Sequence, residues 1–107
     1  MLIRGNLRKA RQLHWKKREG GFLRLLGEIQ TRRGESDNAI SNLNASIDIL
    51  KDVGNPRHLW QAHAALGSAF HAVGRPGEAR EQWGAAGATI QNVANGLSDG
   101  EIGRAHV

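Results

Sequence analysis

The sequence predicts an all-α fold, a solenoid of antiparallel helix pairs with about five helices and a short C-terminal tail. Three observations lead to this prediction. Apolar residues recur at helical spacing through most of the chain, and sequence features repeat at an offset of 40 residues. The 107 residues also contain 14 glycines but only two prolines, so glycine is expected to mark most of the helix ends. A chain of this length forms one small domain, residues 1–107.

The offset of 40 residues is carried by several independent positions. The pairs that it relates are Leu26-Gly27 and Leu66-Gly67, Gly34 and Gly74, Ala39 and Ala79, and Leu43 and Trp83. Two antiparallel helices cannot bury their apolar faces alone, whereas stacked pairs can. Gly27 and Gly67 fall inside predicted helices, where glycine costs about 1 kcal/mol relative to alanine. We therefore expect a neighbouring helix to approach each glycine, with Leu43 and Trp83 filling the space.

The first half of the chain predicts three helices. Residues 6–18 resemble the second helix of a truncated unit, and Gly20-Gly21 is expected to separate them from the next helix. A full unit then spans residues 20–54. Its first helix is closed by Gly34 and carries the apolar residues Phe22, Leu23, Leu25, Leu26 and Ile29. Its second helix starts at Ser36-Asp37, carries Ala39, Ile40, Leu43, Ile47 and Leu50, and ends at Gly54.

The second half of the chain repeats this plan over residues 55–96. Asn55 is expected to cap the first helix, and Pro56 occupies its first turn, where a missing N–H is harmless. Gly74 should end that helix in a left-handed conformation. Pro76 opens the last helix, Asn95-Gly96 is expected to stop it, and residues 97–107 are predicted to form a tail.

The spacing of these residues resembles the tetratricopeptide repeat (TPR). The second unit carries the resemblance best, through Leu66-Gly67-x2-Phe70, Gly74, Ala79-x3-Trp83 and Ala86. Units of 40 residues with a Gly-Asn-Pro-Arg junction, residues 54–57 here, look like the repeats of large bacterial transcriptional activators and of signalling ATPases and cyclases. The resemblance implies a non-enzymatic scaffold for protein–protein interaction, either by itself or as a fragment of a larger bacterial regulatory or signalling protein.

The resemblance also implies where a protein or peptide partner would bind. The first helix of each unit in such a solenoid lines the concave face. The corresponding residues here are Arg24, Glu28, Thr31, Arg32, Gln61, Ala64, Ser68 and His71. The alternative interpretation is that these side chains are only solvated. Fewer than three complete repeats also predict self-association, a homo-oligomer formed through the open ends of the solenoid.

Charge is concentrated near the N-terminus. Residues 1–33 contain ten basic and two acidic side chains, a net charge of +8, whereas residues 34–107 have a net charge of −3. The basic patch comprises Arg8, Lys9, Arg11, Lys16, Lys17 and Arg18, with Trp15 among them. Such a face can bind phosphates and stack on bases, so a nucleic-acid-binding module is the alternative function. The leading interpretation of the patch is nevertheless a solvated outer helix, and an acidic protein surface is another candidate partner.

Several classes of function are excluded or disfavoured. With no cysteine the chain has no disulfide, zinc-finger or thiol chemistry, and the sequence has no phosphate-binding, serine-hydrolase or His-Glu-x-x-His motif. The histidine pairs His58/His63 and His63/His71 lack the spacing of a helix-borne metal site. We therefore expect no catalytic residue, no cofactor and no metal. The sequence shows no signal-peptide or membrane-helix pattern, which predicts a cytoplasmic protein without membrane contact.

Overall fold

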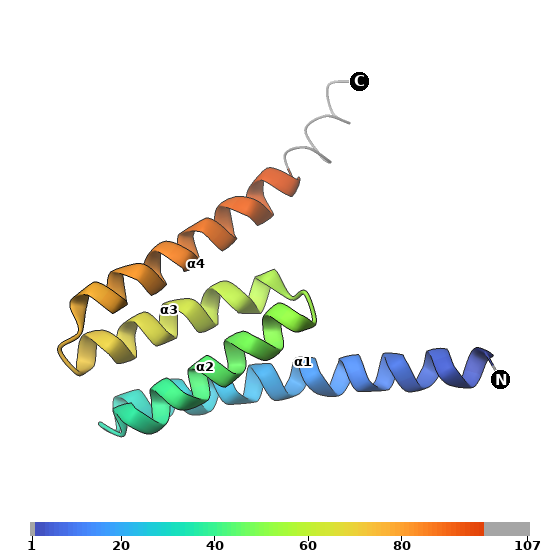
Figure 1. Cartoon of the computed structure of the whole chain (residues 1–107), viewed down its shortest axis with the longest axis horizontal. Helices are drawn as coiled ribbons and strands as arrows, with labels where there is room; N and C mark the ends of the chain where they lie inside the picture. The colour runs from blue at the N-terminus through green and yellow to red at the C-terminus, as the bar shows by residue number, and fades with distance from the viewer. Residues whose placement is uncertain (1, 98–107) are drawn as a thin grey trace.

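The computed structural model describes residues 2–97, with the side chains of Lys9 and of residues 11–96. This part of the chain is all-helical and contains no strand, as the sequence predicts. The four helices are α1 (Leu2–Arg32), α2 (Ser36–Asp52), α3 (Pro56–Ala72) and α4 (Pro76–Leu97). Short turns at residues 33–35, 53–55 and 73–75 reverse the chain, so each helix runs roughly antiparallel to the one before it (Figure 1).

The predicted break at Gly20-Gly21 is wrong, because α1 continues through both glycines. Two of the five predicted helices are thus one continuous helix, and the described residues form four helices. Gly20 is buried, and a Cβ atom there would come within 2.9 Å of the Leu50 side chain on α2. The hydroxyl of Ser46 on α2 also donates a 2.6 Å hydrogen bond to the Gly20 carbonyl. Gly20 thus lets two helices approach closely, and this packing offsets the roughly 1 kcal/mol helix penalty of a glycine.

The three turns are built from the same hydrogen bonds. Gly34, Gly54 and Gly74 follow the ends of α1, α2 and α3, and they are the described residues with positive φ, between +67° and +79°. At each turn the glycine N–H and the next N–H bond back to carbonyls of the last helical turn, the double bond of a Schellman motif. The predicted helix ends at these three glycines are confirmed. Asn55 caps α3 through the N–H of His58, with Pro56 in the first turn, also as predicted.

The predicted stop at Asn95-Gly96 is wrong, because α4 includes both residues and is described as far as Leu97. A glycine ends a helix by adopting a positive φ, and Gly96 does not do so. The predicted tail, residues 97–107, lies outside the described residues from Ser98 onward.

The core lies where the helices cross. Contacts join α1 to α2, α2 to α3, α1 to α3, and α3 to α4. The buried cluster is formed by Ala39, Leu43, Ile47, Leu50, Ala62, Ala65, Leu66, Ala69, Phe70 and Ala79. Leu43 lies against Gly27, and Trp83 lies against Gly67, so closely that a Cβ atom on either glycine would overlap the neighbouring side chain. The expectation that these two glycines admit a neighbouring helix is confirmed.

Part of the predicted apolar pattern is exposed rather than buried. Phe22, Leu25 and Ile29 on α1 are 65%, 50% and 49% exposed, and Trp83 and Ile90 on α4 are also substantially exposed. The two helices lie at opposite edges of the molecule (Figure 1). Helical periodicity identifies an apolar face, but the face is buried only where another helix lies against it.

Candidate partner-binding groove

The helices α1 and α3 border a groove with a cavity volume of about 560 Å³. Its lining residues are Arg24, Glu28, Thr31, Arg32, Trp60, Gln61, Ala64, Ala65 and Ser68. Side chains three, four or seven residues apart share one face of a helix, which is why each helix contributes a compact row. The two rows face each other because both helices pack against α2 and contact one another.

Seven of the eight residues predicted on the concave face line this groove. The exception is His71, one turn beyond Ser68 and nearer the end of α3. Its ring lies 5.9 Å from that of Trp83 on α4 and is not part of the groove lining. Sequence reasoning missed Trp60 and Ala65. Trp60 stands four residues before Ala64, so helical spacing alone was enough to place it beside the predicted row.

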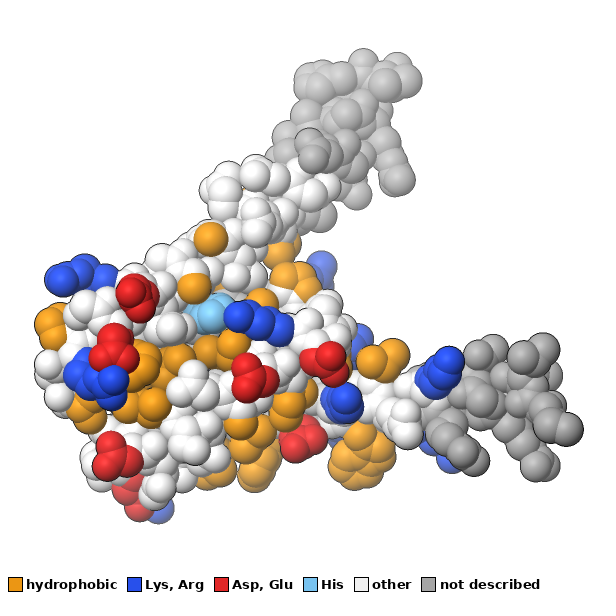
Figure 2. Space-filling view, in the orientation of Figure 1, with side chains coloured by type: hydrophobic (Ala, Val, Ile, Leu, Met, Phe, Trp, Pro, Cys, Tyr) orange, Lys and Arg blue, Asp and Glu red, His pale blue; other side chains and the backbone are white. Residues whose placement is uncertain are grey.

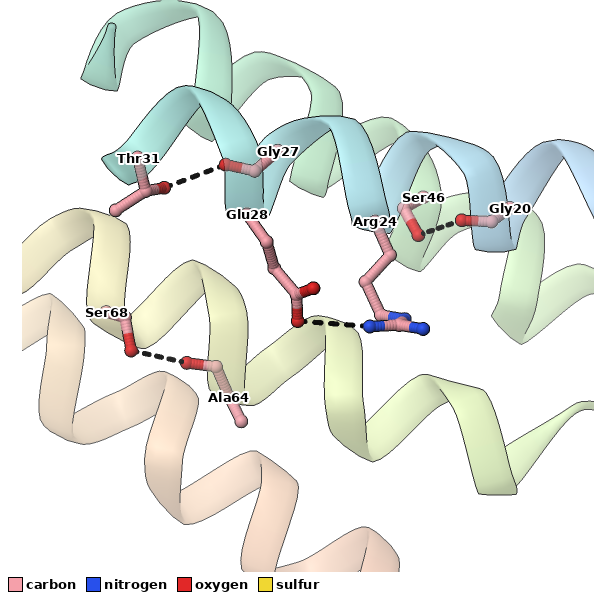
Figure 3. A network of polar contacts seen from close by, with 8 residues as sticks. All are labelled: Gly20, Arg24, Gly27, Glu28, Thr31, Ser46, Ala64 and Ser68. Atoms are coloured by element: carbon pink, nitrogen blue, oxygen red, sulfur yellow. Dashed lines mark hydrogen bonds and ion pairs between the residues drawn. The ribbon is translucent and has the colours of Figure 1, made fainter. Parts of the chain in front are cut away.

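An ion pair lies within the groove. The guanidinium Nη1 of Arg24 donates a 3.0 Å hydrogen bond to Oε1 of Glu28, one turn later on α1. Both side chains reach from α1 toward α3, as Figure 3 shows. The Nε atom of Arg24 is buried and has no hydrogen-bond partner within the described protein. The groove therefore contains an arginine whose donors are only partly used.

The two groove hydroxyls are turned back onto their own helices. Thr31 Oγ1 donates to the Gly27 carbonyl at 2.8 Å, and Ser68 Oγ donates to the Ala64 carbonyl at 3.3 Å (Figure 3). Their protons are used within the protein, so these hydroxyls present acceptor lone pairs to a ligand. The remaining side-chain donors of the groove lining are those of its two arginines, of Gln61 and of the Trp60 indole.

The predicted basic patch surrounds the N-terminal part of α1, which extends beyond the end of α2 (Figure 1). Its described side chains, those of Lys9, Arg11, Lys16, Lys17 and Arg18, are all exposed, and the side chain of Arg8 lies outside the described set. Trp15 among them is 68% exposed. Lys16 forms one surface ion pair, 3.2 Å from Asp52 at the end of α2. The other basic side chains have no ion pair among the described residues.

The histidines take separate positions. His63 is buried, and its Nδ1 atom lies 2.8 Å from Oε1 of Gln82, which links α3 to α4. His71 lies against Trp83, and His58 is exposed at the start of α3. Among residues 2–97 no three His, Asp or Glu side chains are grouped as a metal ion would require. No helix in this same part of the chain has the length and apolarity needed to cross a membrane.

Comparison of the chain with protein-family models, with curated proteins and with solved structures found no match.

Proposed function

We propose that this chain is a scaffold rather than an enzyme, and that the groove between α1 and α3 binds a peptide segment of a partner protein. The observation that carries the proposal is the convergence of two helices, 40 residues apart in sequence, on one groove of about 560 Å³. Ligand sites have volumes of this order and combine apolar walls with a few placed polar groups. Trp60, Ala64 and Ala65 supply such walls here.

The charges of the groove favour an acidic segment. Two arginines, Arg24 and Arg32, line it against one carboxylate, that of Glu28. A guanidinium binds a carboxylate through two parallel hydrogen bonds, and Arg24 has a buried Nε donor without a partner. An aspartate or glutamate of the partner would compete with Glu28 for Arg24.

The arrangement of the helices supports a TPR-like architecture as part of this proposal. Each unit of the 40-residue repeat is one helix pair, α1 with α2 and α3 with α4, and the same glycine turn follows α1 and α3. The groove is then bordered by the first helices of two consecutive units, where the resemblance to tetratricopeptide repeats would locate a ligand. The exposed or half-buried groove positions are free to vary without disturbing the core.

A test is to select binding peptides from a random peptide library and to measure their affinities by calorimetry. We expect the selected peptides to be enriched in aspartate and glutamate. Ala64→Arg fills the groove and should weaken binding at least about tenfold, or 1.4 kcal/mol. Ser41→Arg, on the exposed face of α2, introduces the same side chain away from the groove and should leave the affinity unchanged. Equal affinities of the two variants would contradict the proposal.

A second candidate, nucleic-acid binding, rests on the N-terminal part of α1. Exposed basic side chains surround Trp15 there, a combination that suits phosphate contacts with stacking on a base. Titration of the chain with single-stranded DNA at several salt concentrations tests it. Affinity should fall steeply with salt and should fall further in the Arg11→Ala/Arg18→Ala variant than in an Arg57→Ala/Arg80→Ala control. Affinity that is independent of salt, or equal in the two variants, would exclude this function.

A further inference from the structure

The residues Phe22, Leu25 and Ile29 form an exposed apolar face on α1, here called the α1 outer face. Their spacing of three, four and seven residues puts them on one side of the helix. Gly20 and Gly27, which contact α2, lie about 160–200° away around the helix axis from this side. Figure 2 shows hydrophobic side chains gathered along the edge of the molecule that α1 forms.

The internal repeat indicates which kind of element covers such a face. Forty residues later the same positions are Ala62, Ala65 and Ala69 of α3, and all three are buried. They belong to one cluster with residues of α2, among them Ile47. The preceding helix, α2, therefore covers one face of α3, and the equivalent face of α1 is uncovered. An equivalent helix lying on α1 would bury Phe22, Leu25 and Ile29 in the same way.

The helix α4 carries the surface equivalent to the covering face of α2. The buried Ile47 corresponds to Gly87 at the 40-residue offset, and the exposed Asn44, three residues earlier, corresponds to Gly84. A Cβ atom on Gly84 or Gly87 would meet nothing within 4 Å, in contrast to Gly27 and Gly67, which each receive a bulky side chain. Each of these two exposed glycines lowers the stability of the helix by about 1 kcal/mol relative to alanine. Close packing of another chain against them would offset this cost.

The two uncovered faces are complementary in size. Between α2 and α3 the first helix supplies Ile47 and the second supplies alanines, whereas α4 offers glycines and α1 offers Phe22, Leu25 and Ile29. In the first contact the large side chain is on the covering helix, and in the second the large side chains would be on the covered helix. A pairing of α4 with α1 can therefore fill a similar volume. Because α1 and α4 lie at opposite edges of one molecule, the pairing requires two molecules (Figure 1).

We propose that α4 of a second copy of this chain covers the α1 outer face, so that copies join head to tail. Such a contact joins two different surfaces, the α1 outer face of one copy and α4 of the next. Every assembly then has one free α1 outer face and one free α4, so further copies can be added at both ends. Charge favours this arrangement over a symmetric pairing of two α1 helices. The symmetric pairing would bring together two segments of net charge +8, whereas the head-to-tail contact sets that segment against α4, whose charged residues Glu78, Arg80 and Glu81 give a net charge of −1. The contact does not depend on what the groove binds.

Disulfide cross-linking tests the geometry directly, because the chain contains no cysteine. By the repeat, Arg80 on α4 corresponds to Ile40 and would lie near Ile29 of the next copy. A mixture of the Ile29→Cys and Arg80→Cys variants should form a covalent dimer under mild oxidation. A mixture of Ile29→Cys with Ser41→Cys, an exposed position on α2, should not. A dimer of Ile29→Cys with itself, or no cross-link in the first mixture, would overturn the proposal.

Sedimentation of blocked variants provides an independent test. Phe22→Asp blocks the α1 outer face and Gly87→Arg blocks α4; both positions are exposed, so both variants should keep the helical circular dichroism of the parent chain. The parent chain should grow beyond a dimer between about 1 µM and about 1 mM, the range in which contacts of moderate strength saturate. Each variant alone should remain a monomer, and their equimolar mixture should stop at a dimer. A parent chain that stays monomeric, or variants that still assemble alone, would overturn the proposal.

Discussion

The indole of Trp83 on α4 lies over the backbone of Gly67 on α3, where its Nε1 atom donates a 3.3 Å hydrogen bond to the carbonyl of Ala64. Leu43 on α2 lies over Gly27 on α1 in the same manner. Both members of the first pair stand 40 residues after those of the second. The repeat in the sequence is therefore a repeat of one helix–helix contact, a glycine on one helix that receives a large side chain from the next.

Gly27→Ala should lower the free energy of unfolding by about 1–2 kcal/mol, because overpacking outweighs the gain in helix propensity. The new methyl group would overlap Leu43, which is fully buried and cannot move aside. Urea denaturation followed by circular dichroism measures the change. Gly21→Ala is the matched control on the same helix, since its Cβ atom meets nothing within 4 Å. That variant should be as stable as the parent or slightly more so, and an equal loss in both would contradict the contact.

Gly67→Ala should be destabilising only while Trp83 is present. In the parent chain the added Cβ atom displaces the indole and weakens its bond to Ala64. In a Trp83→Ala background the same substitution should be neutral or stabilising by up to about 1 kcal/mol, the helix-propensity difference. A double-mutant cycle of unfolding free energies measures the coupling between the two positions. Additive effects would show that the indole does not occupy this space.

Gly74→Ala should destabilise the protein by about 1–2 kcal/mol, the cost of a left-handed conformation for a residue with a Cβ atom. Gly74 has φ of +77°, and its N–H closes the end of α3. Gly77→Ala, three residues later in the first turn of α4, should instead raise the stability slightly, because Gly77 is helical with open space around it. Thermal unfolding of the two variants distinguishes them, and shifts of the same sign would count against the turn geometry.

Gln82→Ala should destabilise the protein by about 1–3 kcal/mol, since it leaves a buried imidazole nitrogen without its partner. Nδ1 of His63 lies 2.8 Å from Oε1 of Gln82, and His63 is buried between α3 and α4. Gln91→Ala removes an exposed glutamine of the same helix, whose bond to Asn95 lies at the surface. Its effect should stay within about 0.5 kcal/mol, as is usual for surface positions. Equal chemical-denaturation midpoints for the two variants would contradict this role of Gln82.

Much of the groove could be predicted from the sequence because helical spacing is a strong constraint. Once Gly27 and Gly67 were aligned, Arg24 and Glu28 had to share a face, as did Gln61, Ala64 and Ser68, and the structure brings both rows together. His71 shows the limit of this reasoning. The sequence correctly places His71 on α3, one turn after Ser68. Whether it lines the groove or lies against Trp83 depends on how the helices cross, which the spacing of residues does not give.

The ends of three helices at Gly34, Gly54 and Gly74, and the start of α3 at Asn55, follow from the residues at those positions alone. These choices are local, since they depend on the φ values open to a glycine and on a side chain that reaches a nearby N–H. In contrast, the packing of the helices against one another determines that Gly20 lies inside a helix and that Phe22 is exposed. A glycine changes helix stability by only about 1 kcal/mol, so contacts with a neighbouring helix determine whether it interrupts a helix or receives a side chain.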